Sequence, residues 1–239
     1  MSAVLHSAAG GVATLTLNRP ESRNALNMEM CDRLILLSRE VQGNEETKLV
    51  FVRANGPVFC AGADLKERQG MGEAQVRERR MKGFAAYAAL EALPMPVIAV
   101  VEGPAVGSGC EIAGACDFIV ATPQASFRTP EALRGSVGAT QRLPRIIGKR
   151  LAKDMMFTGR TLSAEEAREA GLVSRLVSSD LEKTLEEIKQ EILKAPAASL
   201  HLAKRCIDRG VELDPQGALD TEIAAIEEQL ASGSWMGRQ

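Results

Sequence analysis

Short apolar runs alternate with longer helical patterns over the first 130 residues, and this alternation limits the possible folds more than any other feature. Residues 12–17 alternate apolar and polar side chains, as a half-buried strand does. Residues 48–53, 96–101 and 117–121 are short continuous apolar runs, typical of strands buried on both faces. Helices are expected after Asn27 as N-cap, after Asp64, over residues 73–93, and in a short form after the turn at residues 103–109. The order strand, helix, strand predicts an α/β domain with parallel crossovers.

Helical patterns dominate after about Arg145. They predict helices at residues 149–157, 164–170, 181–193, 197–209 and 215–230, and only residues 174–177 still suggest a strand. We therefore expect an α/β core over residues 1–177 and a C-terminal helical subdomain over residues 178–239.

Composition and charge favour some classes of protein over others. The 239 residues include 29 Lys and Arg against 31 Asp and Glu, a net charge of −2, which gives no electrostatic footprint for nucleic acid or an anionic membrane. The five cysteines form no CxxC pair and are odd in number, which indicates a reduced compartment without a structural metal. The first residues lack a signal-peptide pattern, and no apolar run approaches the roughly 18 residues of a membrane helix. We expect a cytoplasmic protein that binds neither nucleic acid, membrane nor metal.

Two glutamates lie beside glycine-rich turns, and a third turn rich in small residues precedes both. Glu111 ends the segment GSGCE, Glu131 lies in TPEALRG, and the third turn is CAGAD. Ser108 can cap a helix that begins at Gly109, so that backbone N–H groups and the positive end of the helix dipole face outward. At the CAGAD turn, Ala63 can keep its N–H group free while Asp64 caps the next helix. If the fold brings these turns together, two backbone donors form an oxyanion hole, and the site suits chemistry on a carbonyl.

Each of these residues also fits an ordinary structural role. Ser108 and Glu111 match the capping box S-x-x-E, in which the glutamate reaches back to the serine N–H. Asp64 and Glu67 match the same pattern. Glu131 follows Thr129 and Pro130, a typical N-cap and N1 pair, so its carboxylate can simply complement a helix dipole. Spacing alone leaves these alternatives open.

Other catalytic signatures fit less well. The segment GSGCEIAG follows a strand and opens a helix, but Ile112 stands where a dinucleotide fingerprint requires glycine, and no P-loop motif occurs. A Ser-His-Asp triad is disfavoured, because His6 and His201 are the only histidines of the sequence. We expect His6 in the first strand and His201 on a helix surface. Cys60 could act as a thiol nucleophile, although a buried, inert cysteine is the commoner case.

Five segments, in their order along the chain, resemble the crotonase superfamily, specifically the enoyl-CoA hydratase/isomerase family. They are NRPESRNALN, FCAGADLKE, PVIAVVEGPAVGSGCEIAGACDFIVA, FRTPEALRGSVGATQRLPRIIGKRLAKDMMFTGR and SAEEAREAGLVSRLV. The resemblance runs from about Gly11 to Val177 and more loosely through the C-terminal helices. It implies a crotonase-like α/β fold of repeated ββα units with a C-terminal helical subdomain, assembled as a homotrimer or a homohexamer.

The resemblance also implies roles for particular residues. The oxyanion-hole donors fall on the N–H groups of Ala63 and Ser108, and the catalytic acids on Glu111 and Glu131. The residues that contact the substrate or its coenzyme A fall on Arg23, Ala25, Leu26, Asp64, Leu65 and Lys66.

The implied reaction is the hydration of a 2-enoyl-CoA to a 3-hydroxyacyl-CoA in fatty acid metabolism. It needs neither metal nor redox cofactor, and coenzyme A is part of the acyl-CoA substrate. Two alternatives remain: a Δ3-Δ2 enoyl-CoA isomerase that uses one glutamate, or a noncatalytic family member that binds acyl-CoA or RNA. Arg128 precedes the Thr-Pro-Glu segment; its guanidinium is expected to lower the pKa of Glu131, to face solvent, or to recognise an acidic acyl group.

Overall fold

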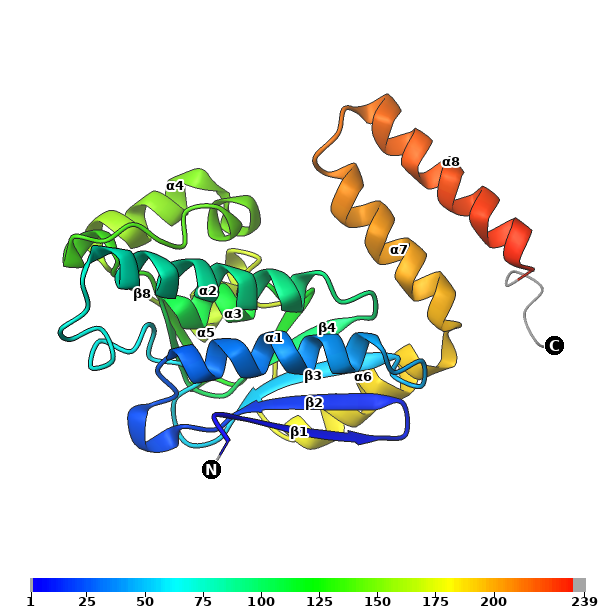
Figure 1. Ribbon diagram of the computed structural model, residues 1–239. Coiled ribbons are helices and arrows are strands. Elements are labelled where there is room, and N and C mark those ends of the chain that lie inside the picture. Colours follow the sequence, from blue (N-terminus) through cyan, green and yellow to red (C-terminus); the bar gives the residue numbers. More distant parts are fainter. Residues whose placement is uncertain (1, 234–239) are drawn as a thin grey trace.

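A six-stranded sheet organises the chain in the computed structural model, which describes residues 2–233. Its order is β1-β2-β3-β4-β6-β9; β1 and β2 pair antiparallel, and every other neighbouring pair is parallel (Figure 1). This confirms the expected α/β fold with parallel crossovers. The strands are β1 (Val4–Ala9), β2 (Val12–Leu17), β3 (Leu49–Ala54), β4 (Val97–Val101), β6 (Phe118–Ala121) and β9 (Arg175–Leu176).

A smaller sheet of three short strands was not expected from the sequence. It consists of β5 (Pro104–Val106), β7 (Ser126–Arg128) and β8 (Thr161–Ser163), with β7 in the centre. Strands of three residues show too few alternations to be recognised as strands. The parallel pairing of β5 with β7 sets Val106 opposite Arg128, so the turns that follow these two strands lie side by side.

Helices cover both faces of the large sheet. They are η1 (Pro20–Ser22), α1 (Met28–Gln42), α2 (Glu73–Glu91), α3 (Ser108–Gly114), η2 (Ala132–Arg134), α4 (Arg142–Thr158), α5 (Ala164–Glu169), α6 (Leu181–Lys194), α7 (Ala197–Gly210) and α8 (Pro215–Ser232). Helix α1 begins where it was predicted, because the Asn27 side chain accepts a hydrogen bond from the Met30 N–H at 2.9 Å. In residues 2–233, no helix is long and apolar enough to span a bilayer.

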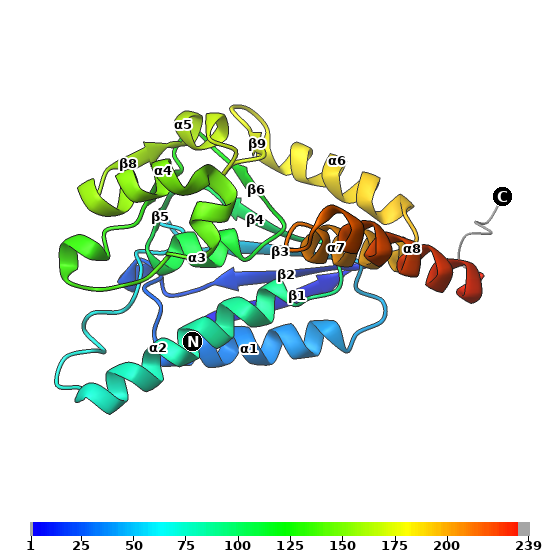
Figure 2. The same cartoon turned by 90° about the horizontal axis from the view of Figure 1, so that it is seen from above.

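The two faces of the sheet bury separate apolar clusters. Helices α1 and α2 lie on one side of the sheet and α6 on the other (Figure 2). Met30, Leu34 and Leu37 of α1 belong to the larger cluster, at the helical spacing read from the sequence. Leu185 and Ile188 of α6 belong to the smaller one. Helix α6 therefore packs on the sheet as part of the body of the protein.

Helices α7 and α8 pair with each other and extend beyond this body (Figure 1). No residue of α7 is buried, and Lys204 ties it to the body through an ion pair with Asp117 at 3.0 Å. The helical subdomain predicted for residues 178–239 contains α6, α7 and α8, while residues 234–239 lie outside the described part of the chain. The boundary at residue 177 stays a prediction.

One of the expected helices is wrong. No helix follows the CAGAD turn; residues 65–70 form successive turns, in which the Asp64 carboxylate accepts the N–H groups of Lys66 at 3.0 Å and Glu67 at 3.2 Å. The helix expected at residues 149–157 is confirmed as the second part of α4, which follows the non-helical Gly148. Gly148 interrupts the backbone of α4 with φ 77° and ψ 151°, and the helical turns before it, which begin at Arg142, were not expected.

Candidate active site

The CAGAD turn and the start of α3 lie against each other. Gly62 has φ +96°, and a Cβ atom at this position would lie 3.0 Å from the Val106 carbonyl oxygen and 4.0 Å from the Ser108 nitrogen. Only glycine fits both this conformation and this close approach. Two backbone hydrogen bonds to Leu26 also stabilise the turn. The Leu26 N–H donates to the Gly62 carbonyl at 2.8 Å, and the Asp64 N–H donates to the Leu26 carbonyl at 2.9 Å.

The predicted oxyanion-hole residues line one cavity of about 520 Å³. Within residues 2–233, neither the Ala63 N–H nor the Ser108 N–H donates to a backbone or side-chain acceptor. Ser108 is the first residue of α3, so its N–H is one of the free donors at a helix start. Two unpaired donors at one cavity can stabilise a developing oxyanion.

The capping box at Ser108 and Glu111 is wrong. Gly107, with φ 52° and ψ −107°, occupies the N-cap position of α3, and no side chain caps this helix. The Gly107 N–H donates to the Arg128 carbonyl at 2.8 Å, which continues the pairing of β5 with β7 and starts the helix one residue earlier than expected. Glu111 therefore does not compete for the Ser108 N–H.

Glu111 is buried and bonded to Arg142 of α4. The residue is 7% exposed, and its Oε2 accepts a hydrogen bond from Arg142 Nη1 at 2.9 Å. The same guanidinium donates to Glu91 Oε2 at 2.6 Å and lies 5.8 Å from the centre of the Tyr87 ring. Burial raises the pKa of Glu111, and the Arg142 charge opposes this shift.

Glu131 lines the same cavity as Glu111 and forms no ion pair of this kind within residues 2–233. Its Oε2 is buried and has no hydrogen-bond partner among residues 2–233. Burial raises the pKa of Glu131, and the Glu111 charge raises it further, while its own backbone N–H and the Arg134 charge lower it. A carboxyl with a raised pKa and no partner is suited to exchange a proton with a ligand.

Two glycines make room for the Glu131 side chain. A Cβ atom at Gly107 would overlap Oε1 of Glu131, and one at Gly138 would lie 3.2 Å from its Cγ.

The expected capping pair in front of Glu131 is wrong. Glu131 itself is the N-cap of η2, with no side-chain capping bond, and the Thr129 hydroxyl is buried without a partner in the described chain. The pairing of β7 with β8 delays the helical turn beyond Thr129.

Arg128 does not act on Glu131. Its Nε donates to the Gly159 carbonyl at 2.6 Å, and it does not line the cavity. The pairing of β7 with β8 turns the side chain toward Gly159, which lies just before β8. The expectation that Arg128 lowers the pKa of Glu131 is therefore wrong.

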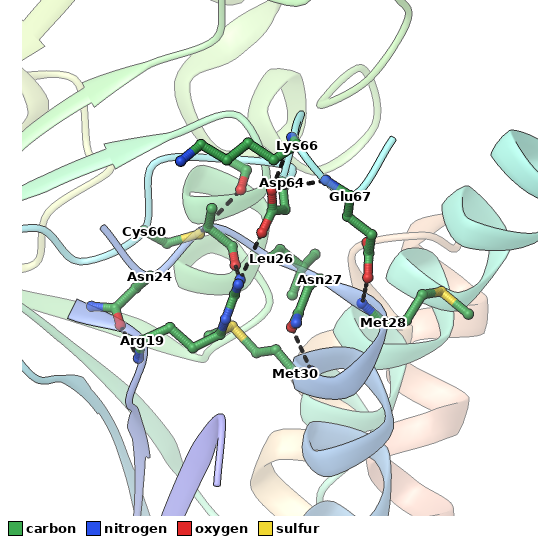
Figure 3. Close-up of polar contacts among 12 residues, drawn as sticks. Arg19, Asn24, Leu26, Asn27, Met28, Met30, Cys60, Asp64, Lys66 and Glu67 are labelled. Carbon is green, nitrogen blue, oxygen red and sulfur yellow. Dashed lines mark hydrogen bonds and ion pairs between the residues drawn. The ribbon is translucent and has the colours of Figure 1, made fainter. Parts of the chain in front are cut away.

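A polar network fixes the turn that carries Ala63. Arg19 Nη1 donates to the Asp64 carboxylate at 2.9 Å and to the Ala25 carbonyl at 2.5 Å (Figure 3). Burial opposes ionisation of Asp64, but the Arg19 guanidinium and the N–H groups of the following turn hold its pKa below the ordinary value. The Asp64 carboxylate thus anchors the turn.

Glu67 connects this turn to α1 and α2. Its Oε1 accepts the Met28 N–H at 2.9 Å, and its Oε2 accepts Arg79 Nε at 2.8 Å. Arg79 also donates to the Leu26 carbonyl, so one guanidinium bonds both Glu67, which follows the turn, and Leu26, which pairs with it. The expected capping box is therefore half present: the Asp64 carboxylate accepts the Glu67 N–H at 3.2 Å, but the Glu67 carboxylate does not return to the Asp64 N–H, which donates to the Leu26 carbonyl instead.

The remaining predicted residues divide into two groups. Leu26 and Leu65 line the cavity, and Leu65 is 51% exposed at its edge. Arg23, Ala25, Asp64 and Lys66 do not line it. Their proposed contacts with coenzyme A stay predictions.

Cys60 and the two histidines lie where ordinary structural residues are expected. Cys60 is fully buried, and burial raises the pKa of its thiol to about 12, so it is not an available thiolate. His6 lies in β1 and His201 on the surface of α7. No cluster of three or more His, Cys, Asp or Glu side chains in residues 2–233 is arranged to hold a metal ion.

Sequence reasoning missed the basic residues of the site. Arg142, which bonds Glu111, comes from a different helix, and no local spacing links the two. Arg68, Arg80 and Arg134 also line the cavity. Their positions depend on how α2 and the loop after Glu131 pack together, which sequence periodicity does not describe.

Comparisons with known proteins agree with this architecture. The family model for enoyl-CoA hydratase/isomerase matches residues 7–236. The putative enoyl-CoA hydratase/isomerase YngF of Bacillus subtilis is 40% identical over 92% of this chain and 86% of its own length. The short-chain-enoyl-CoA hydratase of Clostridium acetobutylicum is 37% identical, also over 92% of this chain and 86% of its own length. The crystal structure of an enoyl-CoA hydratase from Bacillus anthracis superimposes with a TM-score of 0.91 at 36% identity, covering 94% of this chain and 90% of that one.

The sheet order, the packed turns and these structural neighbours define a crotonase fold. The chain belongs to the enoyl-CoA hydratase/isomerase family.

Proposed function

We propose that this protein is an enoyl-CoA hydratase, which adds water across the double bond of a 2-enoyl-CoA to give a 3-hydroxyacyl-CoA. The observation that carries the proposal is the pair Glu111 and Glu131, which line one cavity together with the two unpaired N–H groups of Ala63 and Ser108. The names of the relatives in Clostridium acetobutylicum and Bacillus anthracis support the same reaction.

The mechanism follows from the charges that develop during the reaction. The N–H groups of Ala63 and Ser108 bind the thioester oxygen and draw electron density toward it, which makes the β-carbon electrophilic. One glutamate, as carboxylate, takes a proton from water while the water oxygen bonds to the β-carbon. The other glutamate, protonated at that moment, delivers a proton to the α-carbon, so that water is added in full. The ion pair at Glu111 and its absence at Glu131 give the two acids the unequal environments that this division of labour requires.

Isomerisation of a 3-enoyl-CoA is the second candidate. It needs only one glutamate to move a proton between carbon atoms, and Glu131 is the one without a hydrogen bond to its Oε2. A relative in Mycosarcoma maydis, 37% identical over 93% of this chain and 86% of its own length, is named an enoyl-CoA isomerase/hydratase.

The proposed enzyme recognises its substrate through coenzyme A and needs no further cofactor. Coenzyme A is part of the substrate and contacts Arg23, Ala25, Leu26, Asp64, Leu65 and Lys66. The reaction uses neither metal nor redox cofactor and serves fatty acid metabolism in the cytoplasm.

We further propose assembly as a homotrimer or homohexamer, supported by the apolar side chains that α7 and α8 expose. Ile207 of α7 is 66% exposed, Val211 at the C-cap of α7 is 77% exposed, and Leu230 of α8 is 53% exposed. Apolar side chains gathered on a helix pair outside the body are typical of a subunit interface. Light scattering should give three or six times the 25.6 kDa of one chain.

The loss of enoyl absorbance with crotonyl-CoA tests the proposed reaction in the wild type, Glu111→Gln and Glu131→Gln. A hydratase should lose activity by about a hundredfold or more in both variants, because each removes one acid-base group. Glu78→Gln, which changes an exposed glutamate of α2, serves as the control and should be fully active. An isomerase would instead convert a 3-enoyl-CoA and depend on one glutamate, and a binding protein would show neither activity.

A further inference from the structure

Three arginines that line the cavity have no ionic partner. Arg68, Arg80 and Arg134 all contribute to its wall, yet none forms an ion pair within residues 2–233. By contrast, Arg79 is paired with Glu67 at 2.8 Å and Arg142 with Glu111 at 2.9 Å. Arg68 and Arg134 are exposed, and the Arg134 charge acts on Glu131, so Arg80 is the partly buried arginine of the three that no carboxylate of the described chain pairs with.

Arg80 occupies the most defined position of the three. It comes from α2, and its Nη2 donates to the Ser136 hydroxyl on the loop that follows η2. The Ser136 N–H in turn donates to the Glu131 carbonyl at 2.9 Å, so this loop also carries the proposed catalytic acid. The Arg80 guanidinium thus joins two walls of the cavity beside Glu131.

Apolar side chains, some of them exposed at the cavity mouth, flank Arg80; Phe84 is 46% exposed and Val137 73%. Val76 and Phe84 of α2 line the cavity on either side of Arg80 along the helix, and Val137 lines it from the opposite loop. The hydrogen bond to Ser136 is the only one that Arg80 makes to a described residue. A half-buried guanidinium with one hydrogen bond can still bind a carboxylate through two parallel hydrogen bonds.

Two anionic groups of an acyl-CoA could bind Arg80: a carboxylate at the end of the acyl group or a phosphate of coenzyme A. The reacting carbon atoms lie between Glu111 and Glu131, and the acyl chain continues from them by single bonds. The phosphates of coenzyme A are separated from the thioester by the whole pantetheine arm. Leu26 and Leu65, which we assign to coenzyme A, line the same cavity, but Arg80 is hydrogen-bonded to Ser136 on the loop that carries Glu131, and this favours an anion at the end of the acyl group.

We propose that the acyl group of the substrate ends in a carboxylate, which Arg80 binds with support from the Arg134 charge. The substrate class is then the monothioester of a short unsaturated dicarboxylic acid with coenzyme A. This inference rests on the proposed function and names the substrate of that same site.

A binding measurement tests the inference apart from catalysis. Titration calorimetry compares two unreactive thioesters, glutaryl-CoA with a terminal carboxylate and hexanoyl-CoA without one. The wild type should bind glutaryl-CoA about tenfold more tightly, as expected for one charge-assisted pair. Arg80→Met should abolish this preference and leave hexanoyl-CoA binding unchanged, while Arg80→Lys should keep part of it. Arg77→Met, on the exposed side of α2, is the matched control.

Two results would overturn the inference. One is equal binding of the two thioesters by the wild type, a comparison that needs no variant to fold. The other is an equal loss for both thioesters in Arg80→Met, which would assign Arg80 to the coenzyme A phosphates or to packing. If the preference is found but neither glutaconyl-CoA nor crotonyl-CoA is hydrated, the proposed reaction fails and the carboxylate site stands.

Discussion

Arg142 donates a hydrogen bond from Nη1 to Oε2 of Glu111 at 2.9 Å, and this contact sets the charge around one of the two proposed catalytic acids. Burial alone raises the pKa of Glu111, whereas the guanidinium lowers it. The relationship joins α4 to α3 and makes the protonation of Glu111 depend on a residue from another helix.

Replacing Arg142 by Met should raise the pKa of Glu111 further, because the opposing charge is lost. If Glu111 acts as a carboxylate, the acidic limb of the kcat/KM profile should move to higher pH by about one unit. Arg145→Met removes an exposed arginine of the same helix, paired with Glu212 at 3.1 Å, and should leave the profile in place. A uniform loss of activity at every pH would show that Arg142 is only structural.

Glu131→Gln should stabilise the protein at pH 8 while removing its activity. Burial raises the pKa of Glu131 above its value in the unfolded chain, so the folded state favours the protonated carboxyl. The associated stability is fully present below the unfolded pKa of about 4.3 and is lost as the pH rises through the folded pKa. The uncharged amide avoids this loss, and thermal unfolding should shift upward by about 3 °C at pH 8. At pH 4 the difference should vanish; a destabilised variant at pH 8 would contradict the burial of an unpaired carboxyl.

Gly107→Ala should disable the site by displacing Glu131. The new methyl group would overlap the Glu131 carboxylate, and φ +52° already disfavours alanine. We expect kcat to fall by about tenfold or more, since misplacing a catalytic group by an ångström has effects of this size. Gly135→Ala is the control, because it introduces comparable backbone strain at φ +65° but its Cβ would have no atom within 4 Å. The difference between the two variants then measures the effect of the overlap with Glu131. Equal losses in the two variants would mean that strain, not Glu131, is responsible.

Ser108→Pro should remove the proposed oxyanion donor without changing any acid. Proline is tolerated at the first position of a helix, where its missing N–H breaks no helical bond. The kcat for crotonyl-CoA should fall by about a hundredfold, the usual cost of one oxyanion-hole donor. Ser108→Ala keeps the N–H and should retain activity, and circular dichroism checks that both variants fold. Full activity of the proline variant would exclude this donor.

The sequence was informative where a signal is local. The α1 cap at Asn27 and the apolar spacing of Met30, Leu34 and Leu37 follow from contacts within one helix, and the structure confirms them. The strands β3 and β4 were visible as apolar runs because both of their faces are buried.

The sequence was uninformative where the structure depends on contacts between distant segments. Ser108 fits an N-cap by spacing, but the pairing of β5 with β7 moves the cap to Gly107. Arg142 and Arg80 reach the cavity from α4 and α2, and only tertiary packing brings them there.

Mass spectrometry of the product formed from crotonyl-CoA in ¹⁸O-labelled water tests the central claim most directly. The two acids and the two N–H donors should add one labelled water to each molecule, giving 3-hydroxybutyryl-CoA with the label on the β-carbon. Glu111→Gln and Glu131→Gln should each suppress this uptake. Unchanged crotonyl-CoA with the wild type, or a shifted double bond without added oxygen, would contradict hydration by this site.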